Sequence, residues 1–196
     1  FYLVWLIVFI NVSAGIMLLS VASNMIQSIT GASAAVAATV VGLLGLFNGL
    51  GRIGWSSLSD YLGRTTTYGA FFAVQILAFL ALPNVTTVPL FAAVLFLIVT
   101  CYGGGFACLP AYLADLFGTK ELGAIHGYTL TAWSMAGVAG PTLVARIVEL
   151  TGSYDLAFYV VAGMLGVGLA CVGVLRWRVS VVRAAQLVGT PHGAER

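Results

Sequence analysis

Residues 51–64 read Gly51-Arg52-Ile53-Gly54-Trp55-Ser56-Ser57-Leu58-Ser59-Asp60-Tyr61-Leu62-Gly63-Arg64. Arg52 stands inside a long apolar run, and Asp60 and Arg64 end that run just before the next one begins. Long apolar runs separated by short polar turns are typical of helices that span a membrane and reverse at its surface. The stretch therefore predicts the end of one membrane helix, a tight turn and the start of another.

The composition of the whole chain agrees with that interpretation. Of its 196 residues, 61% are hydrophobic and 7% are charged, whereas a soluble domain has about 25% charged residues. So little polar surface excludes a cytosolic enzyme, and a net charge of +2 is too small for a nucleic-acid-binding surface. We expect an integral membrane protein that is surrounded by lipid and binds no nucleic acid.

Six apolar runs divide the chain, and we expect an all-α membrane protein with six transmembrane helices. Gly, Pro, Asn or charged residues separate the runs. The predicted spans are 1–23, 34–58, 67–82, 88–112, 123–148 and 156–175. Together the spans form one unit, 1–179, and we expect 180–196 to be a disordered cytoplasmic tail.

The eight Lys and Arg residues are distributed unequally between the two sides of this arrangement. Arg146 lies near one side and Arg52 lies within a span. The side that holds the C-terminus has the other six: Arg64, Lys120, Arg176, Arg178, Arg183 and Arg196. Basic loops stay in the cytoplasm. We therefore expect a protein of the cytoplasmic (inner) membrane with both termini in the cytoplasm.

The sequence indicates neither an enzyme nor a metal protein. Cys101, Cys108 and Cys171 lie in apolar runs without CxxC spacing, so we interpret them as packing residues. An intramembrane hydrolase would need a paired nucleophile and base. His126 and Ser134 are eight residues apart on one predicted helix, a separation of about 12 Å. We expect no catalytic residue, no metal site and no cofactor.

Glycines are concentrated within the predicted spans. Gly45 and Gly49 form a small-xxx-small pair, which allows two membrane helices to approach closely. Gly140-Pro141 in the fifth span is the best candidate for a helix kink, because proline removes a backbone donor and clashes with the preceding turn. The glycines have two interpretations: tight packing of a bundle, or helices that bend and slide, as those of a transporter do.

Two short segments resemble each other at an offset of 55 residues, Leu58-Ser59-Asp60-Tyr61-Leu62-Gly63-Arg64 and Leu113-Ala114-Asp115-Leu116-Phe117-Gly118-Thr119. Each has an acid near the end of a span and a glycine three residues later. We expect the aspartates to accept hydrogen bonds from free amides at a helix start, and the glycines to allow a tight reversal. The segments are either two similar turns or part of the internal repeats found in many secondary transporters.

Residues 51–64 resemble the G-x-x-x-D-x-x-G-R loop of the major facilitator superfamily, in the copy between the second and third helices of its C-terminal half. Three stretches resemble its oxalate/formate antiporter branch: Phe9-Ile10-Asn11-Val12-Ser13-Ala14-Gly15, Asn48-Gly49-Leu50-Gly51-Arg52 and Cys101-Tyr102-Gly103-Gly104-Gly105-Phe106. The resemblance implies a twelve-helix carrier that works by alternating access. This chain would supply helices seven to twelve, and its partner would be the missing N-terminal six-helix half.

Arg52 is the most informative single residue. It lies about 9 Å from the midpoint of the predicted span 34–58, and an arginine at the centre of a span costs roughly 2.5–3.5 kcal/mol. One interpretation is that its side chain extends to the cytoplasmic headgroups, or pairs with a carboxylate of the missing half. The other is that its guanidinium faces the central pathway and binds an anion. The resemblance implies the second, because the matching arginine binds substrate in oxalate/formate carriers.

The chain departs from oxalate carriers of this family in its fifth span. Those carriers have a lysine there as a second positive charge, and here Trp133 falls at or near that position. One intramembrane cation suits a monocarboxylate better than a dicarboxylate. The other residues expected to line the pathway are Asn11, Asn48, Tyr102 and Thr131, and the alternative for each is interhelical hydrogen bonding or packing.

The acidic residues fall at the ends of the spans, so this chain offers no obvious proton carrier at membrane depth and favours anion exchange. The resemblance also implies a cytoplasmic gate or staple at Asp60, Gly63, Arg64 and Asp115. The expected function is secondary transport of a small organic anion, with antiport as the mechanism. The alternatives are a six-span structural or assembly protein, and a carrier of the same superfamily for another solute.

Overall fold

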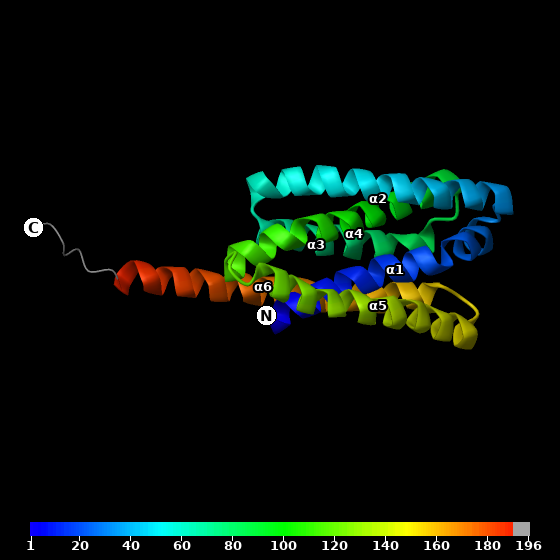
Figure 1. The fold of residues 1–196 in the computed structure, drawn as a ribbon. Helices are drawn as coiled ribbons and strands as arrows, with labels where there is room; N and C mark the ends of the chain where they lie inside the picture. The colour runs from blue at the N-terminus through cyan, green and yellow to red at the C-terminus, as the bar shows by residue number, and fades with distance from the viewer. Residues whose placement is uncertain (190–196) are drawn as a thin grey trace, which may run out of the picture.

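The structure, a computed structural model, describes residues 1–189, with side chains for residues 1–181. Within that range the chain forms six long α-helices and one short 3₁₀ helix. The elements are α1 (Tyr2–Thr30), α2 (Ala34–Leu62), α3 (Arg64–Ala81), η1 (Leu82–Asn84), α4 (Val88–Phe117), α5 (Leu122–Thr151) and α6 (Asp155–Gly189). Successive helices run in opposite directions along one elongated bundle (Figure 1). The all-helical prediction is confirmed for the described residues.

One end of the bundle holds most of the positive charge. The N-terminus, the α2–α3 and α4–α5 connections and the C-terminal part of α6 lie at this end (Figure 1). Its basic residues with described side chains are Arg64, Lys120, Arg176 and Arg178. We call it the basic end. Arg146 lies near the C-terminus of α5, at the opposite end.

Each predicted span corresponds to one helix, but most of the helices are longer than the apolar runs that predicted them. For example, α2 continues to Leu62 and α4 to Phe117. A helix satisfies its own backbone hydrogen bonds, so it can extend past the apolar run into a polar surface layer. α6 likewise continues through Gly189, beyond the predicted boundary at 179. The last part of the predicted tail, 190–196, lies outside the described residues.

Five of the helices are long and apolar enough to cross a membrane: α1, α2, α3 with η1, α4, and α6 as far as Val181. α5 has sufficient length, at 30 residues. Its sequence contains several glycines and threonines and one serine, and it ends in a segment with Arg146 and Glu149, which lowers its hydropathy. A sixth membrane span therefore stays a prediction.

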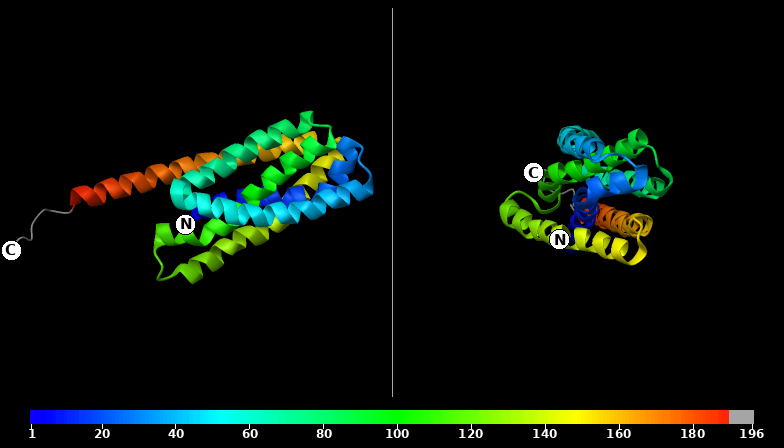
Figure 2. Two further views of the ribbon diagram at one scale, coloured as in Figure 1. Left: turned by 90° about the horizontal axis from the view of Figure 1, so that it is seen from above. Right: turned by 90° about the vertical axis from the view of Figure 1, so that its right-hand side faces the viewer.

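The helices associate mainly in three pairs, α2 with α4, α1 with α5, and α3 with α6. α1 lies in the interior, where it also contacts α2, α4 and α6 (Figure 2). Its buried residues occur on all sides of the helix, as expected for a helix surrounded by others. α2 and α5, in contrast, bury few of their residues. The exposed faces of these two helices are therefore the largest surfaces that the bundle leaves uncovered.

Glycines hold α2 and α4 together, but they are not the predicted pair. A Cβ atom added at Gly51 would lie 2.5 Å from the Thr100 Cα atom, and one added at Gly104 would lie 2.6 Å from the Trp55 Cβ atom. Gly45 and Gly49 have no atom of another helix within 4 Å of such a Cβ position. Close packing of glycine is confirmed at Gly51 and Gly104. Gly45 and Gly49 lie on the open side of α2 and pack against no helix that the structure describes, so close packing at this pair stays a prediction.

Gly140 allows α5 to pack closely against α1, as Gly51 and Gly104 do for α2 and α4. An added Cβ atom there would lie 2.8 Å from the Ser13 carbonyl oxygen. Pro141 follows inside α5, which is continuous from Leu122 to Thr151. The Gly140-Pro141 pair therefore lies at a close contact between α5 and α1, and the kink itself stays a prediction.

Replacing Gly51 by alanine tests the close α2–α4 contact, with Gly49→Ala as the matched control. Both substitutions give α2 a residue of higher helix propensity, but only at Gly51 does the new methyl group collide with the Thr100 backbone. We expect Gly51→Ala to lower the free energy of unfolding by about 1–3 kcal/mol, and Gly49→Ala to leave it unchanged or slightly higher. Thermal unfolding of the full-length protein in detergent measures both. Equal unfolding temperatures for the two variants would contradict the contact.

Candidate functional site

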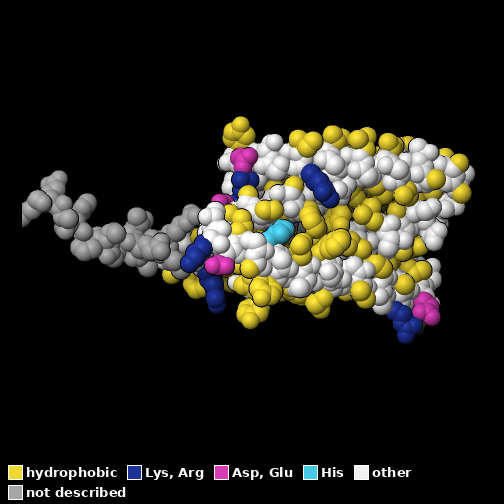
Figure 3. Space-filling view, viewed as in Figure 1, with side chains coloured by type: hydrophobic (Ala, Val, Ile, Leu, Met, Phe, Trp, Pro, Cys, Tyr) yellow, Lys and Arg dark blue, Asp and Glu magenta, His cyan; other side chains and the backbone are white. Residues whose placement is uncertain are grey.

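Arg52 lies near the middle of α2 along the length of the bundle. It is four residues from Asn48, the midpoint of α2, which corresponds to about 6 Å along the helix axis. This is closer to the centre than the sequence predicted, because α2 extends to Leu62. Figure 3 displays a basic group midway along the visible face, whereas other charged groups gather at the two ends. The side chain is exposed and has no ion pair with any side chain that the structure describes.

Two contacts fix the direction of the Arg52 side chain. Its Nε atom donates a hydrogen bond to Asn48 Oδ1 at 3.3 Å, one helical turn away on α2. Its Cζ atom lies 5.7 Å from the centroid of the Phe106 ring of α4, within the range of a cation–π interaction. The guanidinium is therefore directed across the face of the bundle toward α4.

Aromatic rings continue this contact to α5. The Phe106 ring meets Trp133 edge to face, with centroids 6.0 Å apart, a favoured geometry for two aromatic side chains. Trp133 is 44% exposed. Arg52, Phe106 and Trp133 thus connect α2, α4 and α5 in one row, which together with Asn48 we call the Arg52 cluster.

The close approach of α2 and α4 brings this cluster together. Gly103 packs directly against the backbone and side chain of Asn48, and Gly51 packs against Thr100. Trp55 Nε1 also donates a hydrogen bond to Thr100 Oγ1 at 3.3 Å. With the two backbones in contact, the arginine of one helix reaches the aromatic ring of the other. Larger residues at these glycines would move Arg52 away from Phe106.

A second polar contact lies beside the cluster, between α1 and α5. Trp5 Nε1 donates a hydrogen bond to Thr131 Oγ1 at 2.9 Å, and the Trp5 ring stacks on Phe9 with centroids 5.5 Å apart. Thr131 is exposed, and it is two residues from Trp133 along α5. Its oxygen is already engaged by Trp5, so its first role in this structure is to join two helices.

Two predicted pathway residues lie elsewhere. Asn11 is 2% exposed, and its Oδ1 accepts a hydrogen bond from Gln75 Nε2 at 2.8 Å. This pair satisfies polar groups inside the bundle, so Asn11 does not reach the Arg52 cluster. Tyr102 is partly buried, with its ring against Gly15 of α1. The structure therefore brings together Arg52, Asn48 and Trp133, but not Asn11.

Sequence reasoning did not single out Phe106 or Trp5, although both contact predicted residues. Phe106 ends the stretch Cys101–Phe106 and follows Tyr102 by four residues. Residues at that spacing share one face of a helix, so the position of Tyr102 was a usable signal for Phe106. The Trp5–Thr131 contact joins residues 126 positions apart, and nothing local in the sequence indicates it.

The open side of α2 carries two parallel stripes of exposed residues. One stripe consists of small or polar residues: Gly42, Gly45, Gly49 and Arg52. The other consists of large apolar residues: Leu43, Leu46, Leu50 and Ile53. Successive residues of a helix are about 100° apart, so the stripes face different directions. The apolar stripe suits lipid, and the stripe with Arg52 suits a polar or close-packed environment.

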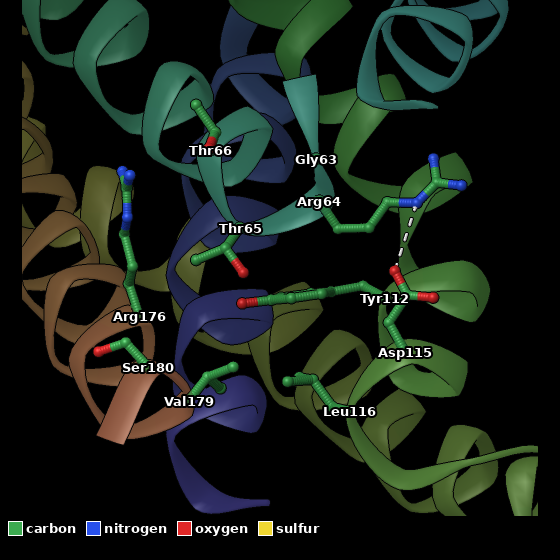
Figure 4. A pocket seen from close by; sticks show the side chains of 10 residues that line it. All are labelled: Gly63, Arg64, Thr65, Thr66, Tyr112, Asp115, Leu116, Arg176, Val179 and Ser180. Atoms are coloured by element: carbon green, nitrogen blue, oxygen red, sulfur yellow. Dashed lines mark ion pairs between the residues drawn. The ribbon is translucent and has the colours of Figure 1, made fainter. Parts of the chain in front are cut away.

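Arg64 joins the two similar turns at the basic end. Its guanidinium donates a hydrogen bond to the Ser59 hydroxyl and lies 2.5 Å from Asp60 Oδ1. Its Nε atom also lies 3.8 Å from Oδ2 of Asp115 on α4, the ion pair that the dashed line in Figure 4 marks. The residues predicted from the loop motif therefore meet at one place, and Ser59 is an additional member.

The turns confirm one expectation and correct another. Gly63 has φ 82° and Gly118 has φ 79°, a backbone conformation that strongly favours glycine, so the expected tight reversals are present. Asp60 does not cap α3, because the N-cap residue is Gly63 and makes no side-chain cap hydrogen bond. Asp60 pairs with Arg64 instead, since an opposite charge lies one helical turn away.

Comparison with known proteins shows that this chain is similar to one protein family and to several membrane carriers. Residues 4–191 match the Major Facilitator Superfamily. The oxalate:formate antiporter of Oxalobacter formigenes is 29% identical over 83% of this chain and 39% of the antiporter. Apicoplast pyruvate carrier 2 of Toxoplasma gondii is 30% identical over 64% of this chain and 19% of that carrier. Monocarboxylate transporter 14 of Mus musculus is 30% identical over 34% of this chain and 13% of that transporter. The chain thus spans less than half the length of these relatives.

The contacts of Arg64 predict that its loss destabilises the fold more than the loss of Arg146. The Arg64 side chain is 19% exposed and contacts two carboxylates and a hydroxyl, whereas Arg146 is 67% exposed and contacts Glu149 alone. We expect Arg64→Ala to lower the free energy of unfolding by about 1–3 kcal/mol, and Arg146→Ala by less than about 1 kcal/mol. Thermal unfolding of the full-length variants provides the comparison. An equal loss in both variants would argue against the Arg64 contacts.

Proposed function

The chain belongs to the Major Facilitator Superfamily, and we propose that it forms part of a secondary transporter that moves a small organic anion by alternating access, as an antiporter. It is similar to an oxalate:formate antiporter, a pyruvate carrier and a monocarboxylate transporter, which supports an organic anion as the solute. The observation that carries the proposal is the unpaired guanidinium of Arg52 near the midpoint of α2.

The energetics of Arg52 support a role in binding. An arginine near the centre of a membrane helix costs roughly 2.5–3.5 kcal/mol, so an unpaired one needs a compensating partner or a water-filled cavity. Its planar, permanently charged fork is well matched to a carboxylate. We infer that the carboxylate of the solute is the partner of Arg52, and that Asn48 orients the guanidinium.

The direction of the Arg52 side chain argues against the alternative that it extends to the headgroups. The nearer end of α2 is the basic end, beyond Ser56 and Asp60. The Nε atom instead bonds to Asn48, one turn farther from that end, and the guanidinium lies near Phe106. An arginine that reached for the surface would point the opposite way.

The surroundings of Arg52 favour a monocarboxylate over a dicarboxylate. α5 contributes Trp133 to the cluster, where it contacts Phe106. It brings an aromatic ring to the place where a second cation would be needed for a dianion. An aromatic wall beside one guanidinium suits a small acid with one charged end and one apolar end. We therefore propose a formate-, lactate- or pyruvate-like monoanion as the solute.

The distribution of acidic residues supports exchange. The acidic residues with described side chains all lie at or near helix ends, so none is a proton carrier at membrane depth: Asp60, Asp115, Glu121, Glu149 and Asp155. Exchange of one anion for another needs no such group. We propose that the exposed charge of Arg52 prevents the empty carrier from changing between its two states. Binding of either anion to Arg52 would then allow that change.

The architecture we propose has six membrane spans, with α5 as the sixth. α5 packs along α1 within the same bundle, which supports this assignment in spite of its lower hydropathy. The basic end would face the cytoplasm at the inner membrane, because basic loops are retained there. The open faces of α2 and α5 would meet an N-terminal six-helix half, with the pathway between the halves.

Two further elements fit alternating access. We propose that the contacts of Arg64 with Asp60 and Asp115, on the turns at Gly63 and Gly118, hold the cytoplasmic side closed in one state and separate in the other. Gly140-Pro141, where α5 packs against Ser13 of α1, would be the point at which α5 bends. Both proposed moving points, the Arg64 contacts and the bend at Gly140-Pro141, lie outside the Arg52 cluster. We therefore expect the geometry of the cluster to be the same in both states.

Substitution of Arg52 tests the proposed function. In proteoliposomes that contain the full-length protein, we expect Arg52→Ala to reduce formate counterflow at least about 100-fold, since two charge-assisted hydrogen bonds are lost. Arg52→Lys should restore part of it, because lysine keeps the charge without the fork. Arg146→Ala, which removes an exposed arginine at the other end, should transport normally. Normal transport by Arg52→Ala would refute the assignment.

Substitution of Trp133 tests the preference for monoanions. Trp133→Lys adds a second positive charge beside Phe106, so we expect oxalate counterflow to rise relative to formate counterflow. Trp133→Phe keeps an aromatic ring and should leave the ratio of the two rates unchanged. If Trp133→Lys and Trp133→Phe gave the same ratio, Trp133 would not be what limits the charge of the solute.

A further inference from the structure

A cavity of about 560 Å³ opens at the basic end, away from the Arg52 cluster. Three elements enclose it: the first turn of α3, the last two turns of α4 and the part of α6 around Arg176 (Figure 4). Its polar lining comes from Arg64, Thr65, Tyr112, Asp115, Arg176 and Ser180. Leu116 and Val179 add apolar surface. The walls therefore combine hydroxyl groups, guanidinium groups and a small apolar area.

A buried hydroxyl group without a partner points into this cavity. Tyr112 is 1% exposed, and its ring stacks on Tyr68 with centroids 4.9 Å apart. Its hydroxyl makes no hydrogen bond of normal geometry within the described residues, although the Thr65 side chain lies close enough to interact with it. Figure 4 displays that hydroxyl beside the Thr65 side chain, directed from α4 toward α6. An unsatisfied buried O–H donor is costly, so the arrangement calls for an acceptor within the cavity.

The charges around the cavity favour an anionic acceptor. Arg176 has no ion pair among the side chains that the structure describes, whereas Arg64 is held by Asp60 and Asp115. Asp115 is the one carboxylate of the lining, and it shares the single positive charge of Arg64 with Asp60. Arg176 is therefore the charge in the lining that attracts an anion. The first turn of α3 also lacks a side-chain cap, so its free N–H groups add partial positive charge.

We propose that this cavity binds a phosphate group, as carried by the headgroup of an anionic phospholipid. Tyr112, Thr65 and Ser180 would supply hydroxyl donors to the phosphate oxygens, and Arg176 would supply the charge. Arginine and helix N-termini both recognise phosphate in this way. The cavity is larger than a free phosphate needs, and Leu116 and Val179 offer apolar contact for the glycerol part of a lipid.

The position of the cavity favours lipid as the source of the phosphate. It lies at the basic end, and Arg64 and Arg176 belong to its lining. Lipid headgroups would be adjacent to this end of the membrane-spanning helices. A lipid bound there would join α3, α4 and α6 next to the Arg64 contacts. The site shares no residue with the Arg52 cluster, so it stands or falls independently of the transported solute.

Lipid binding to the purified full-length protein tests the site without any transport measurement. Native mass spectrometry and thermal unfolding in detergent would compare phosphatidylglycerol, inorganic phosphate and diacylglycerol, which lacks the phosphate. The variants are Tyr112→Phe and Arg176→Ala, with Arg178→Ala as the control, since Arg178 is exposed on the same helix but does not line the cavity. Tyr112→Phe keeps the ring, so its fold should be intact.

We expect wild-type protein and Arg178→Ala to bind phosphatidylglycerol with equal affinity, and Tyr112→Phe and Arg176→Ala about ten-fold more weakly. Tyr112→Phe without lipid should unfold at or above the wild-type temperature, because it removes an unsatisfied hydroxyl. Stabilisation by inorganic phosphate with the same variant dependence would support the phosphate site with free phosphate as its source. Equal affinity for phosphatidylglycerol in all four proteins, or equal binding of diacylglycerol, would overturn the proposal.

Discussion

A positive charge in hydrocarbon needs a partner or water, and Arg52 has no charged partner among the described residues. The two arginines that form ion pairs within the described residues, Arg64 and Arg146, lie near helix ends, where carboxylates neutralise them. Near the centre of α2 that compensation is missing. The charge of Arg52 is thus available to a solute, and the function that we propose follows from this imbalance between the centre and the ends of the bundle.

The geometry around Arg52 depends on how closely two helices approach. Gly51 and Gly103 allow the backbones of α2 and α4 to touch, and this contact brings the guanidinium to the Phe106 ring. Trp133 then extends the aromatic surface to α5. The small residues Gly51 and Gly103 therefore determine where the guanidinium of Arg52 lies relative to the Phe106 ring.

Much of the fold could be predicted from the sequence because apolar runs in a membrane have one common solution, the helix. The motifs around Arg52 and Asp60 also indicated the superfamily and its oxalate/formate antiporter branch, which the matches confirm. Which glycines pack could not be predicted, because Gly45 and Gly51 differ only in the direction they face. The Asn11–Gln75 bond joins residues 64 positions apart, and such pairing depends on the tertiary fold.

The basic end illustrates the same limit. The two similar turns could be recognised from their residues. The tight reversals could also be predicted, because a glycine, which has no Cβ atom, can adopt the positive φ angle that such a turn needs. The sequence could not reveal that one arginine, Arg64, contacts both Asp60 and Asp115, because their proximity results from the packing of α3 against α4. The partnerless hydroxyl of Tyr112 was equally hidden, since tyrosine in an apolar run usually indicates packing alone.

Cysteine labelling at neighbouring positions of α2 tests most directly whether Arg52 faces an aqueous pathway. Arg52→Cys and Ile53→Cys would each be made in the full-length protein after its natural cysteines are replaced by alanine. A charged, membrane-impermeant thiol reagent would then be added to the protein in its membrane. If Arg52 faces an aqueous pathway, modification is rapid at position 52 and absent at position 53, which belongs to the apolar stripe. Modification at position 53 with position 52 protected would show that Arg52 faces away from water.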